Sequence, residues 1–335
     1  MGVHAGFPGV VAGYLGVDLF FVLSGFLITS LMSREFSRTG RVDLLRFWGR
    51  RFLRLMPAYY LYVGSITFLF VALGWGWRGS QQGWSPSHYI ASLWFYYVNY
   101  APGSMWESEE LTQHLWSLSV EEQFYLIWPP LCASALPRRR AEALVVGVLV
   151  RRGFAADGSL RFRLDTRGLG ILLGCAVSLS IEGADRPRLA ALLGRPGLRR
   201  ALAALLAASL AWVSWLATRG RIGEVTVDRY VIPPLDLGFA LLVAMLWRGP
   251  PDGLARALSW RPLAALGTIS YGLYLYHMAA RLLVWRVLTP GMEGWPRLAK
   301  YPLRLALYLG LTVATAAASY ALVERPFLRL KERLR

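Results

Sequence analysis

The sequence predicts an all-α fold, a polytopic bundle of transmembrane helices. Of the 335 residues, 55% are hydrophobic and 17% are charged, and the mean hydropathy is +0.39. A soluble domain carries about 25% charged residues. The apolar residues fall into three blocks without charge (55–77, 201–218, 305–323) and three with one ionisable residue (10–33, 230–247, 262–280). About 20 apolar helical residues cross a bilayer, so these blocks predict a membrane protein.

Other classes of protein fit less well. The net charge of +17 would suit nucleic acid, but the arginines stand in short loops between apolar blocks, where positive charge sets membrane topology. We therefore expect no nucleic-acid partner. Cys132 and Cys175 lie in separate apolar segments without metal-ligand spacing, which favours core packing and no metal. The residue bias is typical of a high-GC bacterial genome, so we expect a multi-pass protein of the bacterial inner membrane.

The pattern predicts about nine crossings in one domain, 1–335. They are 10–33, 55–77, 114–136, about 140–152, 165–183, 201–218, 230–247, 262–286 and 303–323. The arginine-rich loop 34–54 should be cytoplasmic, whereas 78–113, with one Arg against three Glu, should face outward. Within it, Tyr89–Tyr100 is too short to span and should be interfacial or re-entrant.

The later basic segments then fall on the cytoplasmic side. They are 185–200, 248–261 and a tail at 327–335. This assignment requires the run Ala143–Val150 to be part of a crossing, because without that crossing every later loop inverts.

Charged side chains inside spans are costly and mark candidate functional sites. Glu121 and Glu122 stand mid-span and point about 100° apart on a helix, so they should have different roles. The alternative is an ion pair that only fixes helix packing. Arg50, Arg51 and Arg54 lie at the cytoplasmic mouth of a span and would suit a phosphorylated donor such as coenzyme A. Alternatively, they are topology anchors.

Two histidines are candidate bases, because an imidazole can deprotonate a hydroxyl near neutral pH. His4 precedes the first block, and His277 follows Tyr271 and Tyr274, which share a helix face. A hydrogen-bonded packing role for the histidines and an interfacial role for the tyrosines are the alternatives. Taken alone, these residues indicate a membrane enzyme or a transporter.

Six motifs, in this order, resemble those of the acyltransferase 3 family of membrane O-acyltransferases. They are His4–Gly6, Gly16–Thr29, Arg50–Tyr59, Trp116–Tyr125, Ile269–His277 and Glu324–Phe327. The second and fourth are highly specific, and together the motifs cover nearly the whole chain. The resemblance implies a bundle of ten spans. It also implies transfer of an acyl group, acetyl above all, from acyl-CoA to a hydroxyl of a carbohydrate-containing acceptor. Such acceptors are cell-surface polysaccharide, lipopolysaccharide, peptidoglycan and glycosylated metabolites.

The same resemblance implies roles for individual residues, with acyl-CoA as a co-substrate and no permanently bound cofactor. His4 would be the base, Glu121 or Glu122 the essential acid, and Arg50, Arg51 and Arg54 the donor site. The cavity would be lined by Asp18, Ser24, Tyr271, Tyr274 and His277.

One departure from the family concerns the first span. The family's first span precedes the motif histidine, whereas His4 is the fourth residue here. We expect a start site placed too far downstream, or else a truncated and inactive family member. The runner-up function is a carrier or flippase that moves a polar lipid or sugar without chemistry.

Overall fold

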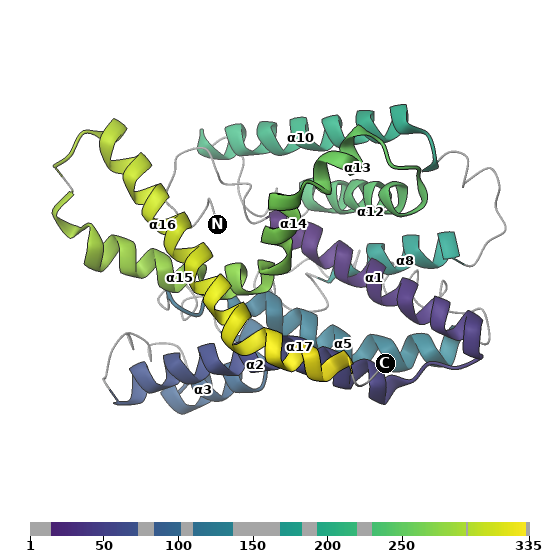
Figure 1. Cartoon of the computed structure of the whole chain (residues 1–335), viewed down its shortest axis with the longest axis horizontal. Coiled ribbons are helices and arrows are strands. Elements are labelled where there is room, and N and C mark those ends of the chain that lie inside the picture. The colour runs from purple at the N-terminus through teal and green to yellow at the C-terminus, as the bar shows by residue number, and fades with distance from the viewer. Residues whose placement is uncertain are drawn as a thin grey trace.

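A computed structural model describes residues 15–72, 84–101, 110–136, 168–182, 193–219, 230–292 and 294–332 (Figure 1). Within these ranges the chain forms helices joined by turns, with no strand, which confirms the all-α prediction. Among the described residues, four helical segments are long and apolar enough to span a membrane: Gly16–Thr39, Leu44–Ala72, Pro196–Leu216 and Leu298–Leu330. The count of about nine crossings is not confirmed, and the crossing near 140–152 lies outside the described residues.

The first two helices, α1 (Leu15–Thr39) and α2 (Leu44–Ala72), are joined by four residues. Most of the predicted loop 34–54 is therefore helical, and that part of the prediction is wrong. Gly40, with φ of 71°, ends α1 in the left-handed conformation that glycine adopts without strain. Asp43 then caps α2 by accepting the N–H of Arg46 at 2.9 Å. Arginine is a good helix former, so its charge marks a membrane boundary without ending the helix.

The segment after α2 contains α3 (Pro86–Trp94) and a 3-10 turn, η3 (Val98–Tyr100). Both are too short to span, as predicted for this region. Tyr89 and Leu93 are buried in an aromatic core shared with α2, where the Tyr59 hydroxyl donates to the Leu93 carbonyl at 2.7 Å. α5 (Leu115–Ala135) then fills the predicted crossing 114–136.

Glycines let α8 (Leu169–Glu182) approach α1 to backbone contact. A Cβ atom on Gly25 would lie 1.9 Å from the Ile171 carbonyl oxygen, and one on Gly174 would lie 2.2 Å from that of Val22. Gly170 and Gly174 form the small-xxx-small pattern by which membrane helices pack closely. The position of α1 is therefore set by α8.

α10 (Pro196–Thr218) and α12 (Ile232–Arg248) lie side by side (Figure 1). Arg199, which is buried, ties them by donating to the Met245 carbonyl in α12 and to the Pro250 carbonyl just after it, and by pairing with Asp252 at 2.6 Å. Asp252 also caps the short helix α13 (Gly253–Leu258). The N–H of Ala255, together with the Arg199 guanidinium, holds the pKa of the Asp252 carboxyl below its usual value.

The predicted crossing 262–286 is divided in two. α14 (Arg261–Thr268) has no buried residue, whereas α15 (Ser270–Leu283) buries one face and continues into a π-helical turn, η7 (Val284–Leu288). Packing therefore ties only the second part to the bundle. A short 3-10 turn, η8 (Pro290–Met292), follows.

The last crossing is α16 (Arg297–Ser319), followed by a π-helical turn, η9 (Tyr320–Glu324), and α17 (Arg325–Glu332). The predicted basic tail 327–335 thus begins as a helix, and α17 packs against α2 (Figure 1).

Contacts between helices fix their relative directions. α1, α5 and α8 run parallel and α2 runs antiparallel to them, as shown by the pairs Ser24–Glu121, Thr29–Trp128, Val22–Gly174, Ser30–Ser178, Trp48–Tyr125 and Tyr62–Leu111. α15 runs parallel to α2, because Tyr271 bonds the Leu55 carbonyl near its start and Arg286 pairs with Glu110 after its end. α5 thus ends, and α8 begins, at opposite ends of the bundle.

The arginine-rich ends of several helices meet at one end of the bundle. Arg34 of α1 lies over the Trp247 ring at the end of α12, 4.6 Å from its centroid, and α17 packs on the same part of the bundle. The positive-inside rule favours a cytoplasmic position for such an end. We call it the inner end, and we call the opposite end, where Glu110 lies, the outer end.

Candidate functional site

A buried ion pair lies where α1, α2 and α5 meet. Arg51 Nη2 of α2 is 3.0 Å from Glu121 Oε1 of α5, and the Glu121 side chain is 2% exposed. The Ser24 hydroxyl of α1 donates to the same carboxylate oxygen. A buried carboxylate needs a positive charge and hydrogen-bond donors nearby. Here α2 supplies Arg51 and α1 supplies Ser24 to Glu121 on α5.

Local helix geometry explains how this pair forms. Tyr125 follows Glu121 by one turn, and the Arg51 guanidinium lies over the Tyr125 ring, 3.2 Å from its centroid. Trp48, one turn before Arg51, donates from Nε1 to the Tyr125 carbonyl at 2.9 Å. The same helical spacing therefore aligns the contacting residues of α2 and α5.

Glu122 faces a different environment from Glu121. It is half-buried and lies within electrostatic reach of Arg51 and of the tyrosines Tyr59, Tyr60 and Tyr96. The two adjacent acids thus diverge, as their helical spacing predicts. One contacts an arginine directly, and the other sits beside aromatic hydroxyls.

The next residue, Gln123, fastens the turn after α3. Its amide donates to the Tyr96 carbonyl at 2.7 Å and to Asn99 Oδ1 at 2.8 Å. Tyr96 is a buried non-glycine residue at φ 55°, an uncommon conformation that the surrounding contacts must maintain. The turn that follows α3 is therefore attached to α5, the helix that carries both acids.

A second group of polar side chains lies one to two turns nearer the outer end. The Tyr274 hydroxyl is 2.5 Å from that of Ser117 and donates to the His114 carbonyl at 2.9 Å. The rings of His114 and His277 meet edge to face, with centroids 4.9 Å apart. His114 Nε2 is 3.1 Å from the Leu275 carbonyl, and His277 Nδ1 is 2.5 Å from that of Tyr274.

The two groups follow one another along α5 and α15, and both lie between α2, α5 and α15, with Ser24 of α1 beside the first group. We call this set of residues the polar column. It consists of Ser24, Arg51, Glu121, Tyr271, Ser117, Tyr274, His114 and His277. It runs from near the inner end toward the outer end, across the region that the apolar blocks predict to be membrane.

Other predicted residues lie beside the polar column or away from it. Arg50 is half-buried and donates from Nε to the Arg46 carbonyl at 3.4 Å, whereas Arg54 is exposed. The main chain of Asp18 lies next to Gly170 of α8. His4 lies outside the described residues.

Several residues of the site were not predicted. They are Tyr125, Trp48, Ser117, His114 and Glu324. A helical-face search from Glu121 would have found Ser117 and Tyr125, which lie one turn to either side. Glu324 follows a π-helical turn, accepts from Ser319 at 3.5 Å and lies within electrostatic reach of Arg54. Its motif was recognised, but its position beside Arg54 depends on how α17 returns to α2.

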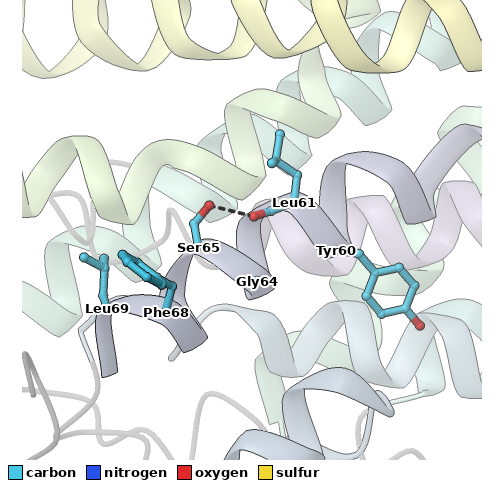
Figure 2. Close-up of a pocket in the computed structure, with 6 residues that line it drawn as sticks. All are labelled: Tyr60, Leu61, Gly64, Ser65, Phe68 and Leu69. Atoms are coloured by element: carbon cyan, nitrogen blue, oxygen red, sulfur yellow. Dashed lines mark hydrogen bonds between the residues drawn. The ribbon is translucent and has the colours of Figure 1, made fainter. Parts of the chain in front are cut away.

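Figure 2 shows a surface pocket on α2, lined by Tyr60, Leu61, Gly64, Ser65, Phe68 and Leu69. The Ser65 hydroxyl donates to the Leu61 carbonyl at 2.8 Å, and most of the other lining groups are apolar. The pocket begins more than two helical turns from Arg51. It brings together no acid, base or cation, and we do not assign the site to it.

The fold and the polar column define a membrane-embedded protein with ionisable groups inside its helical bundle. Its class follows from a family model: the one described as Acyltransferase domain matches residues 2–324. The chain belongs to this acyltransferase family, as the motif resemblance implies.

The curated relatives are named O-acetyltransferases. The peptidoglycan O-acetyltransferase OatA of Listeria monocytogenes is 27% identical over 349 residues, which cover 96% of this chain and 52% of OatA. The O-acetyltransferase OatA of Staphylococcus aureus is 30% identical over 306 residues, covering 82% of this chain and 47% of OatA. YrhL of Bacillus subtilis, provisionally named as a peptidoglycan O-acetyltransferase, is 30% identical over 342 residues, which cover 96% of this chain and 52% of YrhL. The chain spans about half the length of these relatives. No solved structure matches it significantly.

Proposed function

We propose that the chain transfers an acetyl group from acetyl-CoA, at the cytoplasmic face of a bacterial inner membrane, to a hydroxyl of a carbohydrate acceptor of the peptidoglycan type. The polar column carries this proposal, because it places ionisable and hydroxyl groups across a membrane-embedded bundle from the arginine-rich inner end. The names of the relatives supply the acceptor class.

Donor binding would use the inner end of α2. Of the three predicted donor-site arginines, Arg51 pairs directly with Glu121, which leaves Arg50 and Arg54 for the donor, and a guanidinium fork suits the phosphates of coenzyme A. Arg51 would act differently. Its contacts with Glu121 and Tyr125 make it a positioning residue that keeps α2 and α5 in register.

The reaction requires one proton to move. The acceptor oxygen attacks the thioester carbonyl, a C–O bond forms, and the C–S bond breaks with its electron pair passing to sulfur. A base takes the hydroxyl proton, which ends on the thiolate of coenzyme A. By the motif resemblance this base would be His4. A positive or hydrogen-bonding group near the thioester would stabilise the developing oxyanion.

A carrier or flippase is the second candidate function, because buried ion pairs also occur in transport proteins. Release of free thiol separates the two candidate functions. An acyltransferase releases free thiol from acetyl-CoA when acceptor is present, whereas a carrier releases none.

The experiment uses purified protein in lipid nanodiscs with acetyl-CoA and a soluble peptidoglycan fragment. Thiol release and the mass of the fragment are followed together. Acceptor-dependent thiol release with a matching gain of one acetyl group supports the proposal. Binding or movement of substrate without thiol release would favour the carrier.

A further inference from the structure

A cluster of basic residues lies at the outer end, where the positive-inside rule does not favour it. Arg281 on α15, Arg286 on the π-helical turn η7, and Lys300 and Arg304 on α16 gather around the junction of these elements. The Glu110 carboxylate, just before α5, pairs with Arg286 at 2.8 Å and with Arg281 at 3.7 Å. Glu110 thus pairs with two of these four cations, Arg281 and Arg286.

Two of these cations already have a local role. Arg304 is 4% exposed, donates to the Thr289 hydroxyl and carbonyl at 2.9 Å each, and lies over the Trp285 ring at 5.6 Å from its centroid. Lys300 is buried as well and lies near the ring of Tyr301. Arg304 therefore holds the π-helical turn that carries Arg286, and π turns of this kind are frequent at functional sites.

Arg281 and Tyr308 each have a buried polar atom without a hydrogen-bond partner among the described residues. These atoms are Arg281 Nε and the Tyr308 hydroxyl oxygen. Tyr308 is 1% exposed, packs edge to face on Trp285, and lies within electrostatic reach of Arg281. A buried donor without an acceptor is destabilising, so these two donors favour binding of an acceptor between them.

The chemistry of these donors selects the class of acceptor atom. Arg281 Nε and the Tyr308 hydroxyl can both donate, and Arg286 adds positive charge at the same end. An oxygen of a phosphate or carboxylate group satisfies such donors through charge-assisted bonds. The Arg281 side chain is 27% exposed, although its Nε atom is buried.

We propose that Arg281, Arg286 and Tyr308 form a binding site for one anionic oxygen group, phosphate or carboxylate, at the outer end of the bundle. The site anchors the acceptor by that group, so that an acceptor hydroxyl is presented to the polar column. The anchoring role rests on the proposed acetyl transfer, whereas the anion site itself does not.

Binding is measured without acyl donor, on the full chain in neutral detergent, from the thermal unfolding midpoint. The probes are inorganic phosphate against chloride at equal ionic strength, and N-acetylmuramic acid against N-acetylglucosamine, which lacks the carboxylate. Both anionic probes should raise the midpoint of the wild-type protein above that of their controls.

Tyr308→Phe, which removes only the hydroxyl, and Arg281→Gln should each weaken binding about tenfold or more, as expected for loss of a bond to a charged group. Arg256→Gln, on exposed α13 at the inner end, is the matched control and should bind like wild type. The proposal is overturned if the wild-type protein does not distinguish the anionic probes from their controls, or if both outer variants bind as tightly as wild type.

A lipid headgroup is the other source of phosphate. Nanodiscs of phosphatidylglycerol and of phosphatidylcholine separate the two sources. Stabilisation by phosphatidylglycerol alone, lost in Tyr308→Phe, would overturn the acceptor role and assign the site to lipid. If N-acetylmuramic acid binds at the site but acetyl transfer is absent, the anion site stands and the proposed function fails.

Discussion

Replacing Gly25 by alanine tests whether the contact between α1 and α8 supports the site. The new Cβ would lie 1.9 Å from the Ile171 carbonyl oxygen and 2.8 Å from its carbonyl carbon, both main-chain atoms that cannot rotate away. Restoring ordinary contact requires the two helices to separate by about 1.5 Å, and overpacking on this scale costs about 3 kcal/mol. Ser24 is the adjacent residue, so its bond to Glu121 should be lost as well.

The matched control is Gly64→Ala on α2. A Cβ there meets nothing within 4 Å, so alanine should stabilise the helix by about 0.5–1 kcal/mol. Thermal unfolding in detergent compares the two variants, and acetyl transfer reports on the site. The reasoning is refuted if Gly25→Ala unfolds at the wild-type temperature, or if Gly64→Ala loses as much stability as Gly25→Ala.

The remaining predictions concern the ionisable groups. Glu121→Gln should abolish transfer, whereas Glu122→Gln should be milder, because only Glu121 contacts Arg51; equal activities would contradict this. Arg51→Gln should lower the free energy of unfolding by about 3 kcal/mol, since it leaves a buried carboxylate unpaired. Arg50→Gln should instead raise the acetyl-CoA concentration needed for half-maximal rate at unchanged stability, and an unchanged donor requirement would make Arg50 a topology anchor. In an active form, His4→Ala should lower turnover by about 10²–10⁴ at normal expression, and near-parental turnover would exclude it as the base.

Much of the architecture was predictable because apolar length and the placement of arginine are encoded locally. The helix α5 within 114–136 and the short segment before it are of this kind. The helical ends around 34–54 were not, because arginine outside the bilayer continues a helix as readily as it begins a loop. The division of 262–286 depends on α15 finding a partner face and α14 lacking one, which only tertiary packing determines.

The sequence indicates several residues of the candidate site, but it does not indicate which of them contact one another. Helical spacing separates Glu121 from Glu122, and the structure places them in different surroundings. That Arg51 rather than another cation meets Glu121 depends on the register of α2 against α5. The contacts of Tyr274 and His277 with residues near α5 depend on the packing of α15, which the sequence does not specify.

The central claim is acyl transfer by this chain, and acceptor-dependent turnover tests it most directly. Wild-type protein and Glu121→Gln, matched for expression, are supplied with acetyl-CoA with and without a soluble peptidoglycan fragment. We predict that only the wild-type protein with acceptor releases thiol and that the fragment gains an equal number of acetyl groups. Thiol release by neither protein, with the fragment unchanged in mass, would contradict the account.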